Sequence, residues 1–189
     1  MAEPGGSGPI GPFPPGVDTD GQIVEYDKLR RRVLWTMPSG LFVVGSRGED
    51  AGVRHLMTAN WITQLSFAPK LLGVSVERTA ITHGLVAATR CFSVSIIGRE
   101  DRAIVRKFTK PTETDAEAGT INEVAYIERV TGAPILSQAV AFCDCELRET
   151  LEVGDHTLFV GEVVDAAFLR DDETTPVLRM EDTRMNYGG

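Results

Sequence analysis

Cysteine is scarce in this sequence, and long apolar runs are missing. The 189 residues include three cysteines, Cys91, Cys143 and Cys145, none with a His or Cys partner at metal-ligand spacing. We therefore expect reduced thiols that pack as small apolar residues, and no metal site. No apolar stretch approaches the ~20 residues that a membrane-spanning helix needs. The first residues also lack the basic and apolar regions of a signal peptide, so we expect a cytoplasmic protein.

Positive charge is also in deficit. Lysine and arginine number 19 against 27 aspartates and glutamates, which gives a net charge of −8. Such a chain is poorly suited to a nucleic-acid backbone or an anionic membrane, so we exclude both as main partners. The Gly-x-Gly-x-x-Gly motif and the strict strand–helix alternation of a doubly wound dinucleotide fold are missing as well.

What is present is a series of short β-rich segments. Residues 1–22 are rich in Pro and Gly without apolar periodicity, so we expect a flexible arm there, followed by one domain over residues 23–189. Helices are expected at Glu25–Met37, Thr82–Thr89 and Glu100–Lys107, with a polar loop or lid at Lys110–Glu123. Strands are expected at Leu41–Gly45, Leu56–Trp61, Leu71–Val76, Cys91–Ile97, Ala139–Glu152, His156–Phe168 and Pro176–Met180. Six or so strands with few helices predict a β-barrel.

The segment His55–His83 concentrates polar residues that suit a ligand. Arg78 and Thr79 follow its second strand, and Thr82 is a candidate N-cap for the helix that comes next. A helix N-terminus with cationic and hydroxyl neighbours suits an anion such as a phosphate. The pattern therefore predicts a phosphate-binding site about one strand away from Thr58, where short polar side chains and backbone amides gather.

Two motifs carry a resemblance to a known family. MTANWITQLSFAPKLLGVSV at Met57–Val76, followed by THGL, and GDHTLFVGEV at Gly154–Val163 are similar to the core of the flavin reductase-like proteins. The resemblance covers Leu29–Gly189, and the order and separation of the motifs make it specific. It implies a mainly β fold: the FMN-binding six-stranded split β-barrel of Greek-key type, with a few short helices.

The resemblance implies an NAD(P)H-dependent flavin reductase. It implies FMN as the flavin, with FAD as the alternative, and NADH or NADPH as the hydride donor. It also implies a homodimer and a monooxygenase partner that receives reduced flavin. Hydride transfer needs positioning and hydrogen-bond donors and no nucleophile, which agrees with the lack of a catalytic-triad motif.

The first motif supplies the residues that the resemblance places around the flavin ring. These are Thr58, Ala59, Asn60, Trp61, Ser75 and Val76. Two of them have equally good structural interpretations. Trp61 can be an indole of the core, and Ser75 can satisfy a backbone carbonyl within its strand.

The phosphate or ribityl tail is expected at Arg78, Thr79, Thr82 and His83. A His at a helix start can also be a cap or a surface residue. His55 departs from the family pattern, in which a small residue or Asn is common, and this departure puts the local ring contacts in doubt. Lys70 departs too, where a second proline is frequent.

The second motif places Asp155 and His156 near the flavin and the nicotinamide. His156 is the candidate catalytic residue, because it can stack on or bond the nicotinamide carboxamide, or steer the pyrophosphate when protonated. The alternative is a hairpin turn at Gly154–Asp155 followed by an ordinary strand residue. Tyr187 can stack at a flavin edge, dock in a dimer groove or belong to a frayed tail.

Two other functions stay open at this level. One is an FMN-binding carrier or sensor without NAD(P)H turnover. The other is a flavoenzyme that acts on its own organic substrate, with Lys110–Glu123 shaping the pocket.

Overall fold

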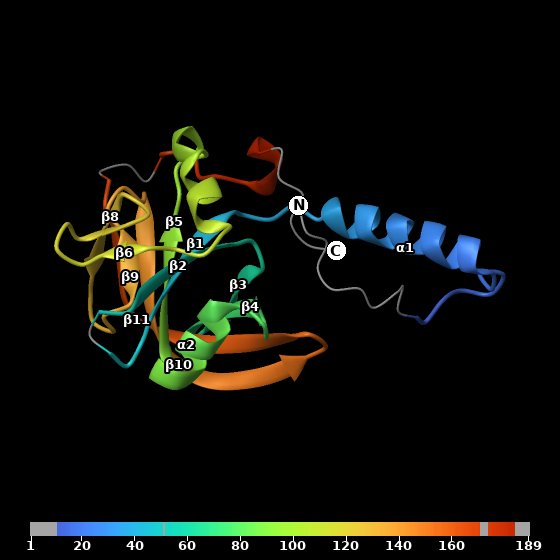
Figure 1. The fold of residues 1–189 in the computed structure, drawn as a ribbon, viewed down its shortest axis with the longest axis horizontal. Helices are drawn as coiled ribbons and strands as arrows, with labels where there is room; N and C mark the ends of the chain where they lie inside the picture. The colour runs from blue at the N-terminus through green and yellow to red at the C-terminus, as the bar shows by residue number, and fades with distance from the viewer. Residues whose placement is uncertain (1–10, 51, 171–173, 184–189) are drawn as a thin grey trace. The chain divides into compact units, whose positions relative to one another are not determined.

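The computed structural model describes residues 11–50, 52–170 and 174–183. The chain divides into two compact units, of which Ser39–Thr183 contains the strands and the other contains the first helix. That helix, α1, spans Asp20–Trp35 (Figure 1). The side chain of Thr19 accepts a hydrogen bond from the Gln22 N–H, and the Gln22 side chain accepts one from the Thr19 N–H. This capping box starts the helix inside the segment expected to be an arm.

The predicted bounds of α1 are therefore wrong at both ends. The helix begins before Glu25 and ends before Met37. Its predicted apolar face is not buried, since Leu29 is 50% and Val33 57% exposed. Capping at Thr19, rather than apolar periodicity, sets where this helix begins.

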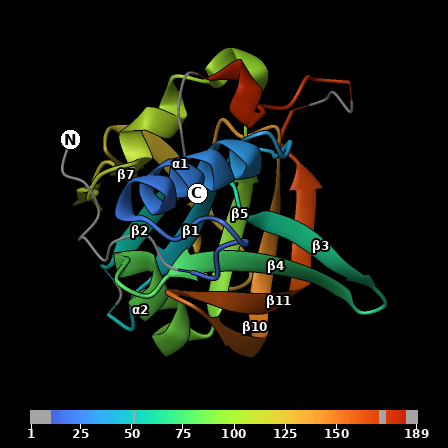
Figure 2. The same ribbon diagram turned by 90° about the vertical axis from the view of Figure 1, so that its right-hand side faces the viewer.

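The larger unit is built on one seven-stranded antiparallel sheet (Figures 1 and 2). Its order is β2-β1-β5-β10-β11-β4-β3. The strands are β1 Phe42–Arg47, β2 Arg54–Ala59, β3 Ile62–Phe67, β4 Lys70–Glu77, β5 Cys91–Ile96, β10 Ala141–Val153 and β11 His156–Phe168.

The two edge strands of this sheet are neighbours in the sequence. Only Asn60 and Trp61 separate the end of β2 from the start of β3. A chain advances at most ~3.6 Å per residue, so this link brings the two edges within about 10 Å. The sheet must curl into a barrel, and because no ladder joins β2 to β3 in the described residues, the barrel is split. The expected split-barrel fold is confirmed, with seven strands in the main sheet instead of six.

Strand β3 was not predicted from the sequence. Four of its six residues are exposed, and Ile62 and Ser66 are half-buried. An edge strand open to solvent lacks the period-two alternation that marks a half-buried strand. Three predictions for later segments are confirmed: β5, the β10–β11 pair and the tight turn at Gly154–Asp155.

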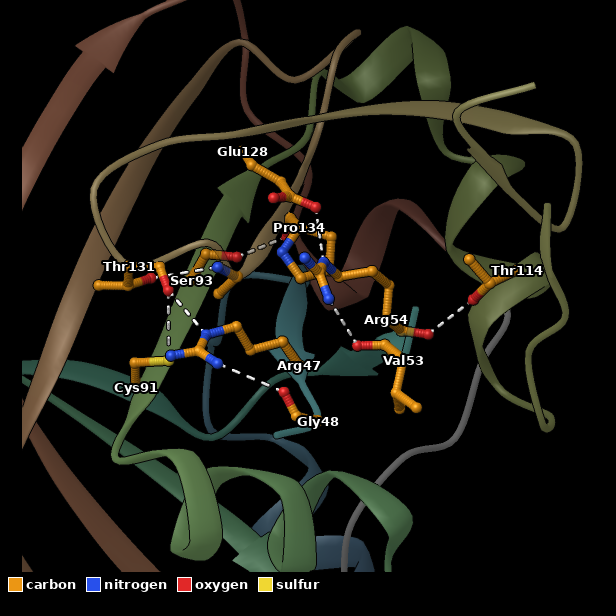
Figure 3. A network of polar contacts seen from close by, with 11 residues as sticks. Arg47, Gly48, Val53, Arg54, Cys91, Ser93, Thr114, Glu128, Thr131 and Pro134 are labelled. Carbon is orange, nitrogen blue, oxygen red and sulfur yellow. Dashed lines mark hydrogen bonds and ion pairs between the residues drawn. The ribbon is translucent and has the colours of Figure 1, made fainter. Parts of the chain in front are cut away.

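A second, four-stranded sheet begins in Lys110–Glu123, the segment expected to be a loop, and continues beyond it. It comprises β6 Thr114–Asp115, β7 Thr120–Ile121, β8 Val124–Glu128 and β9 Pro134–Leu136. The polar contacts in Figure 3 fasten it to the main sheet. Arg54 Nε donates to Glu128 Oε1 at 2.6 Å, and Arg47 Nε donates to the Thr131 carbonyl at 2.8 Å. These polar contacts join the second sheet to β1 and β2.

Short helices complete the unit. They are α2 Ile81–Thr89 and the 3₁₀ turns η1 Arg99–Asp101, η2 Ile104–Phe108 and η3 Met180–Asp182. The single helix expected at Glu100–Lys107 is thus two separate 3₁₀ turns. The strand expected at Pro176–Met180 is reduced to isolated bridges from Val177 to Gly98 and from Arg179 to Gly40. Tyr187 lies outside the described residues.

The barrel interior is apolar. Its buried cluster includes Val44, Val76, Phe92 and Phe159, together with Cys145, which packs there as predicted. Burial raises the pKa of the Cys145 thiol, so it behaves as an inert packing group. In the part of the chain that the structure describes, no group of three His, Cys, Asp or Glu side chains could hold a metal ion. No helix there is long and apolar enough to cross a membrane.

The attachment of the second sheet predicts a steric effect at Gly45. A methyl group on Gly45 would collide with the Pro134 carbonyl and with Ser93 Oγ, which donates to that carbonyl at 2.6 Å. We expect Gly45→Ala to lower the free energy of unfolding by about 2–3 kcal/mol, as overpacking of a close contact does. Urea unfolding followed by circular dichroism measures it. The control is Gly84→Ala, because nothing lies within 4 Å of a Cβ there, and this change should be neutral or add up to about 1 kcal/mol in a helix. Equal stability of the two variants would contradict the prediction.

Candidate functional site

Three segments that are distant in sequence meet at one end of the barrel. The Ser75 N–H donates to the Trp61 carbonyl at 3.0 Å, which ties β4 to the link between β2 and β3. The Arg78 N–H donates to the Asp155 carbonyl at 3.0 Å, and His156 pairs with Glu77 across β11 and β4. The backbone thus brings the two sequence motifs together.

Trp61 and His156 form an aromatic wall where the motifs meet. Their ring centroids lie 4.8 Å apart with planes inclined at 50°. Trp61 is 44% exposed, so its interpretation as a core indole is wrong. His156 Nδ1 lies 2.6 Å from Asp155 Oδ1. This hydrogen bond holds the pKa of Asp155 below its usual range and fixes the imidazole beside the indole.

The other residues of the first motif are largely buried. Thr58 is fully buried, and its hydroxyl donates to the Val105 carbonyl at 2.5 Å. Ala59 and Asn60 are 4% and 8% exposed. The Thr58 hydroxyl hydrogen therefore holds η2 against β2 and is not directed at a ligand. Among these four neighbouring residues of the first motif, Trp61 is the one whose side chain is exposed.

The two candidate residues of β4 lie in different places, Val76 in the core and Ser75 near the site. Val76 is 1% exposed and belongs to the apolar cluster of the barrel, so its side chain does not line the site. Ser75 is half-buried and pairs with Leu158 of β11. Ser75 remains the residue of this strand with a polar side chain near the Trp61 corner.

Helix α2 begins at this corner without a side-chain cap in the described structure. Its N-cap is Ala80, so the prediction that Thr82 caps the helix is wrong. The N–H groups of a first helical turn have no acceptor within the helix, and of those in α2 the His83 N–H donates to the Ala80 carbonyl at 3.1 Å. Arg78, whose side chain is 50% exposed, lies just before the helix, and its guanidinium is 3.9 Å from Glu152 Oε2. Thr79 Oγ1 donates to Glu77 Oε1 at 2.8 Å. Open amides beside a partly exposed guanidinium fit a phosphate group.

Histidines flank the first turn of α2 on both sides. His83 Nε2 lies 2.9 Å from Thr157 Oγ1, and its ring centroid lies 5.1 Å from that of Phe159. His83, expected to contact a phosphate, therefore bridges α2 and β11. On the other side, His55 Nδ1 lies 3.1 Å from the fully buried Thr82 Oγ1. His55 was noted in the sequence only as a departure from the family pattern, and no periodicity marked it as a partner of α2.

A separate pocket of about 440 Å³ lies at η2 and the second sheet. Its lining residues are Arg106, Lys107, Lys110, Pro111, Glu113, Asn122 and Glu123. Lys107 Nζ is 3.3 Å from Glu123 Oε2 and 3.1 Å from the Asn122 carbonyl. None of the ring or phosphate residues predicted from the sequence lines this pocket, although the segment Lys110–Glu123 contributes to it.

The contact between Asp155 and His156 gives a titration that can be measured. Because the hydrogen bond from His156 stabilises the carboxylate, the pKa of Asp155 lies below its usual value. We expect His156→Ala to raise it towards 3.8, the value for an unperturbed Asp. Carboxyl ¹³C NMR over a pH series measures the change. Asp182, whose low pKa is caused first by the Arg179 backbone N–H, is the control and should not move. An unchanged Asp155 midpoint in the variant would exclude this contact in solution.

Comparisons with known proteins identify the family of this chain. The family model for the flavin reductase like domain matches residues 34–188. The NADH-dependent FAD reductase of Streptomyces globisporus is 34% identical over 139 residues, which is 72% of this chain and 73% of that protein.

Two solved structures share the fold. The NADH:FAD oxidoreductase of Streptomyces globisporus C-1027, in complex with NAD and FAD fragments, has a TM-score of 0.68 at 28% identity, covering 82% of this chain and 87% of that one. The styrene monooxygenase flavin reductase of Pseudomonas putida S12 has a TM-score of 0.64 at 29% identity, covering 73% of this chain and 86% of that one. With the family model matched over most of its length, this chain belongs to the flavin reductase like domain family.

Proposed function

We propose that this protein is an NADH-dependent flavin reductase that supplies reduced flavin to a monooxygenase partner. The observation that carries the proposal is the meeting of both motifs at one corner of the barrel, with an exposed aromatic wall beside an uncapped helix N-terminus. The relatives support the reaction, since one is named an NADH-dependent FAD reductase. The partner is supported by a relative that is the flavin reductase of a styrene monooxygenase.

Each group at the corner has a task in this function. The Trp61 indole and the His156 imidazole offer flat surfaces to a planar ring. The first-turn amides of α2 and the Arg78 guanidinium bind the phosphate that the flavin carries. When bound, the flavin supplies the ring that accepts a hydride from the nicotinamide. Since Nδ1 of His156 is engaged by Asp155, its Nε2 is the nitrogen left to bond the nicotinamide carboxamide.

The identity of the flavin and of the hydride donor is a finer part of the proposal. We favour FAD and NADH because both appear in the name of a close relative, whereas the sequence motifs alone favoured FMN. The ring, the ribityl chain and the first phosphate are common to both flavins, so the corner suits either. A cytoplasmic location stays a prediction, and the three free cysteines support it.

Steady-state NADH oxidation with added FAD or FMN tests the reaction. We expect turnover that depends on flavin, and a rise of roughly three- to tenfold in the flavin KM for Arg78→Ala. That range discounts the energy of a charge-assisted hydrogen bond because the guanidinium is half exposed. Arg106→Ala, in the separate pocket, is the control and should leave the flavin KM unchanged.

Other outcomes of the same assay favour the other functions. Flavin binding without NADH oxidation would indicate a carrier or sensor. NADH oxidation that requires an added organic substrate would indicate a flavoenzyme that acts on that substrate. If Arg106→Ala raised the flavin KM more than Arg78→Ala does, the phosphate would instead bind in the pocket at η2.

The exposed edge strand β3 supports a homodimer. Leu65 and Phe67 are 46% and 85% exposed on it, and its outer edge has no partner strand among the described residues. Unpaired edges and exposed apolar groups are covered by association. We propose that a second copy of this chain covers β3.

Analytical ultracentrifugation tests the homodimer. We expect a dimer for the unmodified protein and, for Phe67→Ser, a dissociation constant raised at least tenfold, because burying a Phe side chain contributes roughly 1.5–3 kcal/mol. Val130→Ser, which changes another exposed residue (66% exposed) on a turn, is the control. A monomer at all concentrations, or equal effects of both variants, would exclude this interface.

A further inference from the structure

We propose that His55 is a positioning residue for the flavin phosphate, acting through the hydrogen bond between its Nδ1 and Thr82 Oγ1 in the first turn of α2. The inference rests on the proposed function, because it takes the α2 N-terminus as the seat of that phosphate. In the described structure His55 has no ring contact or hydrogen bond with Trp61 or His156, so it would act only by fixing the helix.

The bond joins two rigidly held groups. His55 is 9% exposed and pairs with Ser46 in the β1–β2 ladder, so its backbone cannot shift without breaking the sheet. Thr82 is fully buried, and its Oγ1 lies 3.1 Å from His55 Nδ1. Burial lowers the pKa of His55, so the ring is neutral at pH 7. The neutral imidazole and the hydroxyl are both buried. Breaking their hydrogen bond would leave each polar group without a partner, which costs free energy.

A second bond holds the adjacent residue on the opposite side. His83 Nε2 lies 2.9 Å from Thr157 Oγ1 of β11, and Thr157 directly precedes Leu158 in the strand that begins with His156. Consecutive residues of one helical turn are thus tied to β2 and to β11. The start of α2 is clamped between the two strands that carry the ring-side motifs.

This helix needs such a clamp. It has nine residues, has no side-chain cap in the described structure and buries only Thr82 and Val86. A helix of that length is marginal on its own, so tertiary contacts set its position. The direction of its first-turn N–H groups depends on how firmly that turn is held. Loss of one anchor would tilt these donors while leaving the barrel folded.

The consequence is specific to phosphate. FMN and riboflavin share the ring and the ribityl chain and differ only in the phosphate. A residue that aims the phosphate donors affects the binding of FMN and leaves that of riboflavin unchanged. A residue that only stabilises the fold affects both equally.

The experiment uses the full chain freed of flavin and measures Kd for FMN and riboflavin by fluorescence titration. We expect His55→Phe, which keeps a ring but loses the bond, to weaken FMN binding roughly tenfold and riboflavin binding less than twofold. The kcat of NADH oxidation should stay within about twofold while the KM for FMN rises. His55→Asn places an amide atom where Nδ1 stood, and it should restore most of the FMN affinity.

A second variant guards against misfolding. Thr82→Val breaks the same bond from the helix side at nearly constant volume, and it should repeat the loss for FMN alone. Equal weakening for both ligands, no change for either, or a failure of His55→Asn to rescue would overturn the proposal.

The two hypotheses fail in different ways. If the unmodified protein binds FMN more tightly than riboflavin but does not oxidise NADH, the reductase function is wrong and the role of His55 is still decided by the variants. If it oxidises NADH while the variants weaken both ligands alike, the role of His55 is wrong and the function stands. If it binds neither ligand, both are wrong.

Discussion

The link of two residues between β2 and β3 is the constraint on which this structure depends. Asn60 and Trp61 join the two outer strands of a seven-stranded sheet, and so short a link forces the sheet to close on itself. The closure places Trp61 where its carbonyl meets the Ser75 N–H and its indole meets His156. The candidate site therefore forms where the short link closes the barrel.

Hydroxyl side chains near this closure are used mainly for positioning. Thr58 holds η2 through the Val105 carbonyl, and Thr82 and Thr157 each hold a histidine. Buried hydroxyls with single, well-defined partners fix orientation at little cost when they are satisfied. The groups left for a ligand are then backbone amides, Arg78 and the exposed ring faces. This division of labour suits an enzyme whose chemistry comes from a bound cofactor and whose own task is orientation.

Sequence reasoning anticipated which segments meet at this corner and described several of their side chains poorly. The motif match placed Trp61, Arg78 and His156 at one corner because a shared backbone carries them there. It misjudged Thr82, since hydroxyl residues near a helix start resemble caps in sequence, and only the fold reveals that this one points at His55. It missed β3 because an exposed edge strand has no burial periodicity. Its loop at Lys110–Glu123 was wrong at β6 and β7, because strands of two residues are too short to show a periodicity.

The bare start of α2 has a further consequence. Ala80 has no side-chain oxygen, and its carbonyl accepts only the His83 N–H in the first turn, so water solvates the first-turn amides that remain when no ligand is bound. A ligand there competes with mobile solvent rather than with a capping side chain. Such a position favours rapid exchange of a ligand over permanent retention.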